Sequence, residues 1–262
     1  MSFTAKDVMT LREKTGLGMM DCKKALKEQG GDMAAAEAWL RESRKDKMDT
    51  RTERATGEGR IGIACGDNAA VIVEIQTETD FTARTEAFMA MVDAVTDLAL
   101  SKGDGDVSPC EGMTRMVDEV RMTTGENANF ARGFRLSGGS FGQYIHHDGK
   151  RACLIQVDGD TDGDLLKGIC QHIVFHDPAG ISEDDISSED IDRIRTEALA
   201  EASEAGKNDE IAEKIADGKV RKHLEENTLL HQKYVLDETQ AIKDVLPDGV
   251  SITRFVRYTL GA

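Results

Sequence analysis

An acid and a large aromatic side chain stand together in the run TETDFTAR, residues 77–84, directly after a segment with strand-like alternation and directly before one with helical spacing. Loops at such corners usually carry small polar residues. The local pattern allows two interpretations. Either Asp80 caps the next helix and Phe81 begins its buried face, or the two side chains act outside the core, as an aromatic wedge with an acid beside it.

Histidines offer a second candidate chemistry. His172 and His176 are four residues apart, a spacing that can bind zinc on one helix face, but Ile173 stands where a zinc protease needs its catalytic Glu. Packing and hydrogen bonding of both imidazoles is the simpler interpretation. A metal-dependent hydrolase stays an alternative, and it would use His146, His147, His172 and His176.

Cysteine chemistry and nucleotide binding are less well supported. Cys22 lies beside Lys23 and Lys24, which could activate a thiol, but its place on an apolar helix face favours a buried and inert side chain. The five cysteines are scattered and form no C-x-x-C pair, so we expect free thiols and no zinc ribbon. The phosphate-binding loop G-x-x-x-x-G-K-[ST] does not occur in the sequence, and we expect no cofactor.

The charge distribution favours a protein partner. The 262 residues carry a net charge of −16, but residues 1–60 hold 13 Lys and Arg against 11 Asp and Glu, which leaves 20 against 38 for residues 61–262. Such an acidic body would repel a phosphate backbone, so no direct nucleic-acid contact is expected. No apolar run is long enough for a membrane span and the first residues do not resemble a targeting segment, which predicts a cytoplasmic protein without membrane contact.

The first forty residues have the pattern of three short helices. The first begins with a capping box, Thr4-x-x-Asp7, the second covers residues 19–29, and Asp32 can cap the third. The charged segment 41–60 has no apolar period and is expected to be an exposed connection, in part helical.

The rest of the chain has an α+β pattern that occurs twice. Residues 61–75 predict a β-hairpin, 82–101 and 109–123 predict helices, and 130–136 predicts a strand. The same order of elements then repeats, as a hairpin at 141–158, a helix at 162–176 and a closing strand at 251–259. We therefore expect a two-part α+β core with antiparallel sheets.

An inserted helical hairpin is predicted between the last helix and the closing strand, at about residues 187–227. Ser187-x-x-Asp190 forms a capping box for its first arm, and Asn208 can cap the second. Each arm of about 18 residues would be about 27 Å long, enough to reach another molecule.

A family resemblance adds what composition cannot. Residues 11–26, LREKTGLGMMDCKKAL, resemble the N-terminal signature of the bacterial elongation factor Ts family. The T-D-F, G-E-N, Y-x-H and E-I-A-E-K motifs of that family are matched, in order, at residues 79–81, 125–127, 144–146 and 210–214. Nearly the whole chain is covered, although Thr82 stands where the family usually has Val.

The resemblance implies a division of the chain. It places a three-helix module like the ubiquitin-associated (UBA) domain at residues 1–43, a charged linker at 44–56, and the two halves of the core at 57–140 and 141–262. The hairpin at about 187–227 corresponds to the helical protrusion of the family.

The resemblance also implies the function of a guanine-nucleotide exchange factor, which needs no covalent chemistry and is not an enzyme. The expected partner is elongation factor Tu, in its GDP-bound and nucleotide-free forms, with Asp80 and Phe81 inserted near the magnesium and phosphate site of the partner. The residues that match partner contacts of the family are Thr79, Asp80, Phe81, Thr82, Lys23, Met19, Met20, Gly125 and His146.

Local alternatives remain for several of these residues. Met19 and Met20 could fill the core of the small bundle, Gly125 could supply a turn with positive φ, and His146 could be a strand residue that faces solvent. For the whole chain, the alternative is a UBA-like binding module on an unrelated scaffold without exchange activity.

Overall fold

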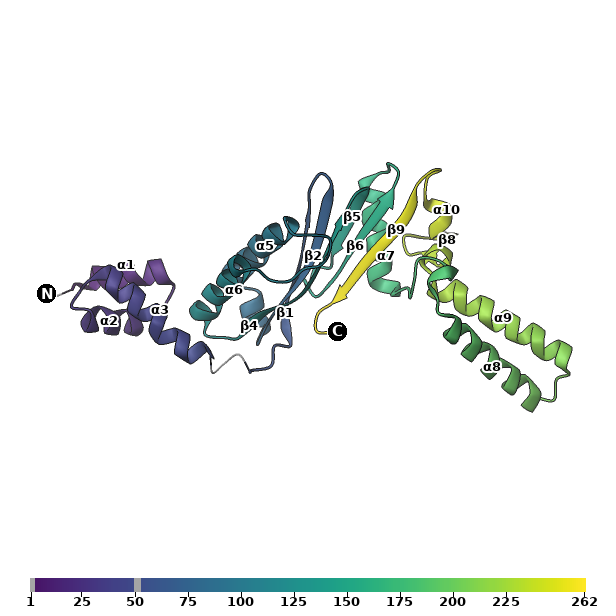
Figure 1. Ribbon diagram of the computed structural model, residues 1–262, viewed down its shortest axis with the longest axis horizontal. Helices are drawn as coiled ribbons and strands as arrows, with labels where there is room; N and C mark the ends of the chain where they lie inside the picture. The colour runs from purple at the N-terminus through teal and green to yellow at the C-terminus, as the bar shows by residue number, and fades with distance from the viewer. Residues whose placement is uncertain (1–2, 50–52) are drawn as a thin grey trace. The chain divides into compact units, whose positions relative to one another are not determined.

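The computed structural model describes residues 3–49 and 53–262, and it has a mixed α+β fold with three N-terminal helices, antiparallel sheets and a helical pair (Figure 1). The chain divides into two compact units. One contains Met1–Ala64, Val71–Arg135 and Leu260–Ala262, and the other contains Cys65–Ala70 and Leu136–Thr259. No helix within the described residues is long and apolar enough to cross a membrane.

The three N-terminal helices are α1 (Ala5–Thr15), α2 (Met19–Glu28) and α3 (Met33–Asp49). The predicted capping box is confirmed, because the backbone N–H of Thr4 donates to the Asp7 carboxylate at 2.7 Å. Helix α3 continues to Asp49, so the first part of the charged segment is helical. The core of this bundle consists of Val8, Leu11, Leu17, Cys22, Ala25, Leu26, Ala36 and Leu40.

The first sheet has the strand order β1 (Glu58–Cys65), β2 (Ala69–Thr77), β4 (Ala128–Ser137) and β3 (Gly105–Asp106). The hairpin and the later strand predicted from the sequence are confirmed as β1, β2 and β4. The two-residue strand β3, which pairs with β4, was not predicted because it is too short to show an alternating pattern.

Three glycines at the start of this sheet, Gly57, Gly59 and Gly62, have the G-x-G-x-x-G spacing of a dinucleotide-binding loop. Gly59 and Gly62 lie inside β1, however, and not between a strand and a helix. A Cβ at Gly59 would stand 2.2 Å from the carbonyl oxygen of Ile75, and one at Gly62 would stand 2.3 Å from the hydroxyl of Thr96. These glycines therefore allow close packing of β1.

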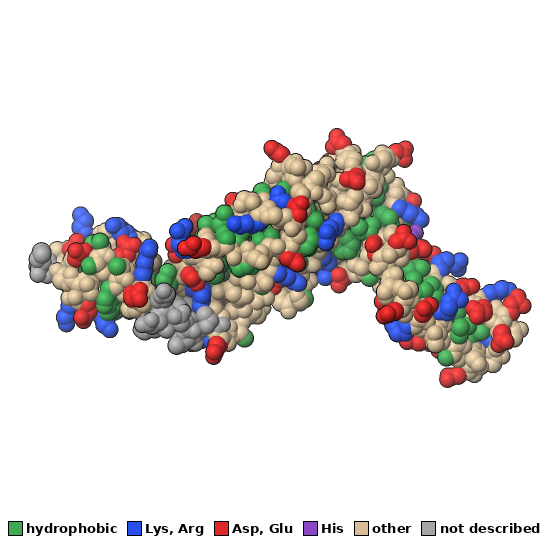
Figure 2. Space-filling view, in the orientation of Figure 1, with side chains coloured by type: hydrophobic (Ala, Val, Ile, Leu, Met, Phe, Trp, Pro, Cys, Tyr) green, Lys and Arg blue, Asp and Glu red, His purple; other side chains and the backbone are tan. Residues whose placement is uncertain are grey.

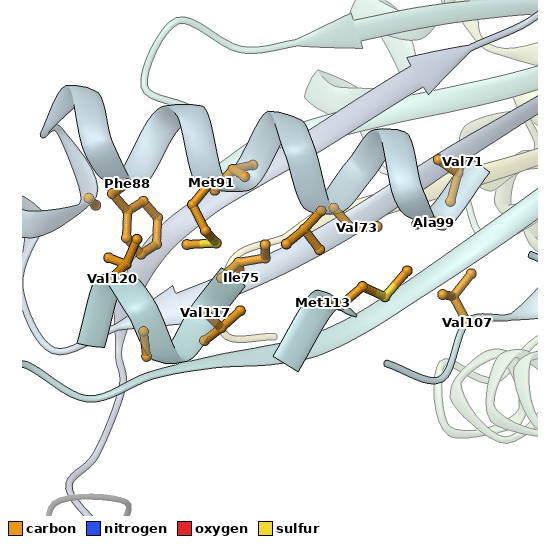
Figure 3. Packing of buried hydrophobic residues seen from close by; sticks show 14 residues of the cluster. Val71, Val73, Ile75, Phe88, Met91, Ala99, Val107, Met113, Val117 and Val120 are labelled. Atoms are coloured by element: carbon orange, nitrogen blue, oxygen red, sulfur yellow. The ribbon is translucent and has the colours of Figure 1, made fainter. Parts of the chain in front are cut away.

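Helices α5 (Glu86–Leu100) and α6 (Glu111–Thr124) pack together with the sheet and close the core of the first unit (Figure 3). The predicted core face is confirmed, since Phe88, Val92 and Val95 are buried. The prediction of one helix over 82–101 is wrong at its start. A separate short helix, α4 (Asp80–Ala83), precedes α5, because the Thr85 hydroxyl accepts from the backbone N–H of Phe88 and so begins a new helix.

The second unit contains the antiparallel strands β5 (Ser140–Ile145), β6 (Arg151–Asp158) and β9 (Ser251–Thr259). Helix α7 (Gly163–His176) packs against this sheet. Its core consists of Cys153, Ile155, Val157, Leu166, Ile169, Cys170, Ile173, Val174, Leu229, Tyr234, Ile242 and Ile252. The predicted hairpin, helix and closing strand are thus confirmed.

The predicted helical hairpin is present as α8 (Ser188–Glu204) and α9 (Asp209–Asn227), which lie side by side (Figure 1). Buried alanines on both arms allow close packing, and acidic and basic side chains are interspersed over the outside (Figure 2). The backbone N–H of Ala179 donates to the carbonyl of Asn227 at 2.8 Å and joins the two ends of the insertion.

Short elements follow and precede the hairpin. They are η1 (Glu183–Asp185), η2 (Leu229–His231), β7 (Lys233–Tyr234), β8 (Asp237–Ala241) and α10 (Ile242–Val245). None of them was predicted, because elements of two to five residues carry no measurable period.

Candidate functional site

The corner after β2 is built around Thr79. Its hydroxyl accepts a 3.3 Å hydrogen bond from the backbone N–H of Thr82, which makes Thr79 the N-cap of α4. The interpretation of Asp80 as the N-cap is therefore wrong. Asp80 is instead the first residue of α4, and its carboxylate forms an ion pair with Arg84, with a nitrogen to oxygen distance of 3.0 Å.

Phe81 projects from this corner. Its side chain is 82% exposed, whereas the next two residues, Thr82 and Ala83, are buried. The interpretation of Phe81 as a core residue is wrong for the free chain, and the aromatic residue that begins the core is Phe88. A large aromatic side chain held outside the core, on a turn whose neighbours are fixed, is typical of a contact surface.

A second polar segment, residues 125–127, holds the corner in place. The Thr79 hydroxyl donates to Oε1 of Glu126 at 2.8 Å, and the Thr79 backbone N–H donates to Oε2 at 3.1 Å. Gly125 ends α6 with a φ of 75°, so the local alternative for this residue, a turn with positive φ, is confirmed, and its partner contact stays a prediction. No role was predicted for Glu126, although the short polar run Gly-Glu-Asn directly before a strand could have indicated one.

Arg54, in the charged segment that precedes β1, is bonded to residues of the same corner. The backbone N–H of Asn127 donates to Oε1 of Glu78 at 2.6 Å, and the Asn127 side-chain amide donates to the carbonyl of Arg54 at 2.8 Å. The guanidinium of Arg54 also pairs with Glu78 at 3.3 Å. These contacts were not predicted, because they join residues far apart in the chain.

On the three-helix bundle, the candidate contact residues are at the surface. Met19 is 52% exposed, Met20 is 76% exposed, and Lys23 is exposed as well. The core face of α2 consists of Cys22, Ala25 and Leu26, so the alternative that the two methionines fill the core is wrong. The expectation that Cys22 is buried is confirmed.

His146 lies in the second unit, one residue beyond β5. The hydroxyl of Tyr144 and Nδ1 of His146 are 2.9 Å apart, and the imidazole meets the edge of Phe175 with ring centroids 5.9 Å apart. It is half-buried, so it is not the solvent-facing strand residue that the alternative expected. Phe175 is itself 59% exposed.

The two histidines of α7 have structural partners. His172 is fully buried, its Nε2 lies 2.9 Å from Oε1 of Gln232, and its Nδ1 accepts from the backbone N–H of Val235 at 3.2 Å. Burial lowers the pKa of His172 from 6.5 to about 4. The imidazole stacks on that of His176, with centroids 4.4 Å apart. With both ring nitrogens engaged, His172 cannot ligate a metal in this state.

The described part of the chain has no cluster of three or more His, Cys, Asp or Glu residues that could hold a metal ion. The polar groups at the Thr79–Glu126 corner are engaged with one another, and the Thr79 hydroxyl is committed both to the Glu126 carboxylate and to the N-cap of α4. The arrangement is suited to contact with a protein, through an exposed aromatic residue on a fixed turn.

Comparison with known proteins identifies the family to which the chain is similar. A family model described as "Elongation factor TS" matches residues 78–262, and one described as "Elongation factor Ts, mitochondrial, N-terminal" matches residues 1–47. The protein named "Elongation factor Ts" from Dinoroseobacter shibae is 38% identical over 273 residues, which cover 100% of this chain and 93% of the relative.

Other relatives agree. "Elongation factor Ts" from Thioalkalivibrio sulfidiphilus is 37% identical over 274 residues, with 100% of this chain and 93% of the relative covered. The protein of the same name from Hahella chejuensis is 36% identical over 265 residues, with 99% and 92% covered.

Proposed function

The chain belongs to the elongation factor Ts family and is a nucleotide exchange factor for elongation factor Tu, and we propose that it promotes GDP release by inserting Asp80 and Phe81 near the magnesium and phosphate site of its partner. A GTPase holds GDP through a phosphate-cradling loop and Mg²⁺. The exchange factor must bind the nucleotide-free partner more tightly than the GDP-bound partner. By linkage, it then weakens GDP binding by the same ratio.

The observation that carries this proposal is the 82% exposure of Phe81 on a turn that is otherwise fixed. Burial of the phenyl ring in the complex would contribute about 1.5 to 3 kcal/mol. The ordering cost is small, because Thr79 is already bonded to Glu126 and Thr82 is already buried. Most of the free energy gained by burying Phe81 can therefore weaken the binding of GDP to the partner.

Asp80 would act through charge. Its carboxylate is paired only at the surface with Arg84, whose side chain is 76% exposed, so the pair can open at little cost. Near the magnesium site, a second carboxylate would compete for the hydrogen bonds and charges that support the metal. This role complements that of Phe81, which needs space between partner side chains.

The other candidate residues divide into contacts and supports. Met19, Met20 and Lys23 form an exposed docking surface on α2, and His146 contributes a second contact in the other unit. Thr79, Thr82 and Gly125 were expected among the partner contacts. We assign them instead to shaping the corner that presents Phe81, because Thr79 is bonded to Glu126, Thr82 is buried and Gly125 ends α6.

The proposed division of the chain is a UBA-like module at residues 1–43, a linker at 44–56 and core halves at 57–140 and 141–262. The separation of the compact units between Arg135 and Leu136 supports a boundary near residue 140. The alternative of a UBA-like module on an unrelated scaffold is wrong, because the family match covers residues 78–262 as well as 1–47.

The proposed partner states are GDP-bound and nucleotide-free elongation factor Tu, met in the cytoplasm, without direct nucleic-acid or membrane contact. The test mixes the chain, at catalytic amounts, with elongation factor Tu that carries fluorescent GDP and an excess of unlabelled GDP. Fast loss of fluorescence is expected. Tight binding of the two proteins without accelerated release would contradict the wedge mechanism.

A further inference from the structure

Three exposed methionines belong to the three N-terminal helices. Met9, Met19 and Met20 are 51%, 52% and 76% exposed, and they are the exposed methionines among the side chains that the structure describes. In the core of the first unit, by contrast, Met91 is 6% exposed and Met113 is fully buried. A solvent oxidant can therefore reach the thioethers of the bundle while these core methionines are protected.

Two of the exposed methionines begin α2 and border a basic face. Met20, Lys23, Lys24 and Lys27 have the i, i+3, i+4, i+7 spacing of one helix face, and all three lysines are exposed. Lys24 lies over the ring of Trp39, with Nζ 5.8 Å from the centroid. Both basic and acidic side chains lie around the hydrophobic ones on this bundle in Figure 2. The face suits an acidic partner surface with an apolar depression.

We propose that Met19 and Met20 are a reversible oxidation site, at which a peroxide converts the thioethers to sulfoxides and releases the factor from its partner. The inference rests on the proposed function, because it requires that the methionine face of α2 contacts elongation factor Tu. It adds a regulation that the exchange mechanism does not need.

The chemistry uses one equivalent of hydrogen peroxide for each methionine. The sulfur lone pair attacks one peroxide oxygen, an S–O bond forms, and the O–O bond breaks. The departing hydroxide takes the proton of the transferred hydroxyl and leaves as water. The thioether loses two electrons and the peroxide gains them. A methionine sulfoxide reductase with a thiol reductant reverses the step.

The sulfoxide changes how α2 can dock. A thioether is apolar and flexible and fits an uneven partner surface. The sulfoxide oxygen is a strong acceptor, and burial of such a group without a donor weakens binding by roughly 5- to 100-fold. Neither side chain belongs to the bundle core, so the oxidised protein should stay folded.

The experiment treats the full chain with hydrogen peroxide, removes the oxidant with catalase, and adds dithiothreitol, which reverses disulfides and sulfenic acids but not sulfoxides. Peptide mass spectrometry measures the oxidation of Met9, Met19 and Met20 separately. The Kd for nucleotide-free elongation factor Tu is then compared before and after treatment. We expect a rise of roughly 5- to 100-fold, and recovery after treatment with methionine sulfoxide reductases A and B.

Matched variants assign the effect. In Met19→Leu/Met20→Leu, the ratio of treated to untreated Kd should stay near one, whatever the affinity of the variant itself, because leucine is apolar and cannot be oxidised. Met9→Leu removes from α1 a thioether about as exposed as that of Met19 and should leave the ratio as large as in the unmodified sequence.

Unchanged affinity of a chain whose Met19 and Met20 are shown to be oxidised would overturn this inference alone. Resistance of Met9→Leu to the treatment, together with sensitivity of the double variant, would overturn it as well. An untreated chain that fails to bind or to release GDP would overturn the proposed contact surface together with this inference.

Discussion

The hydroxyl of Thr79 donates a 2.8 Å hydrogen bond to the carboxylate of Glu126, 47 residues further along the chain. The same hydroxyl accepts from the backbone N–H of Thr82, so one side chain both caps α4 and ties it to the end of α6. This relationship explains how an aromatic side chain can stand in solvent at a defined position, since the turn beneath Phe81 is fixed from both sides.

Removal of the Glu126 carboxylate should loosen this turn. Glu126→Ala leaves the backbone N–H and the hydroxyl of Thr79 without their acceptor, and we expect a loss of about 1 to 3 kcal/mol in the free energy of unfolding. Exchange activity per folded molecule should also fall, because Phe81 is no longer held in one place. Urea unfolding and GDP release measure the two effects. Glu119→Ala, which removes an exposed carboxylate from α6, is the control, and equal behaviour of both variants would contradict the support role.

Asp80 can be separated from its intramolecular partner. Asp80→Ala and Arg84→Ala both abolish the exposed ion pair, and each should change the free energy of unfolding by no more than about 0.5 kcal/mol. GDP release should be slower only with Asp80→Ala, because the proposed action of the carboxylate is on the partner. A matching loss with Arg84→Ala would show that the ion pair, and not the free carboxylate, is what exchange requires.

Because His172 is buried, we expect the free energy of unfolding to decrease at acidic pH. The unfolded chain binds a proton at this imidazole below pH 6.5, whereas in the folded chain burial lowers the pKa of His172 to about 4. In that window the unfolded state holds more protons, so the free energy of unfolding decreases as the pH falls, by up to about 3 kcal/mol. Urea titrations at about pH 7 and about pH 4.5 should show a smaller decrease for His172→Gln than for the unmodified sequence.

The control for this titration is His147→Gln, which changes an exposed histidine and should keep the full decrease. If His172→Gln and the unmodified sequence lost stability equally on acidification, the buried imidazole would not be the group responsible.

The helical pair α8–α9 should be dispensable for folding. Its buried residues, such as Ala198 and Ala216, lie within the pair, and the backbone bond from Ala179 to Asn227 closes the insertion at its base. Replacement of residues 187–226 by a short Gly-rich linker should therefore leave a cooperative thermal transition and part of the exchange activity. A shortened chain without cooperative unfolding would make the pair an integral part of the core.

Local sequence signals predicted most of the long elements. The capping residues Thr4, Ser187 and Asn208 begin the helices that they were expected to begin. The segment 82–101 was predicted as one helix because its apolar residues keep a helical spacing throughout. The structure begins a new helix at the N-cap Thr85, which that spacing does not reveal. Short elements such as β3 were missed since two residues define no period.

The site was only partly predictable. The residue types of Asp80 and Phe81 indicated a candidate functional site at the corner, and the family motif predicted a role for Gly125. Local pattern alone could not decide between a buried and an exposed Phe81, because burial depends on what packs over the turn. Glu126 was missed for the same reason, since its partner Thr79 is adjacent only in the folded chain.

The most direct measurement of the wedge compares Phe81→Ala with Phe88→Ala, two removals of a phenyl ring in one segment, one 82% exposed and one fully buried. Thermal stability and stimulated GDP release are measured on the same preparations. Phe88→Ala should lose about 3 to 5 kcal/mol of stability through a cavity. Phe81→Ala should keep its stability within about 0.5 kcal/mol and lose up to about 3 kcal/mol of coupling to GDP, roughly a hundredfold in exchange rate. A stable Phe81→Ala protein that releases GDP at the unmodified rate would contradict the account.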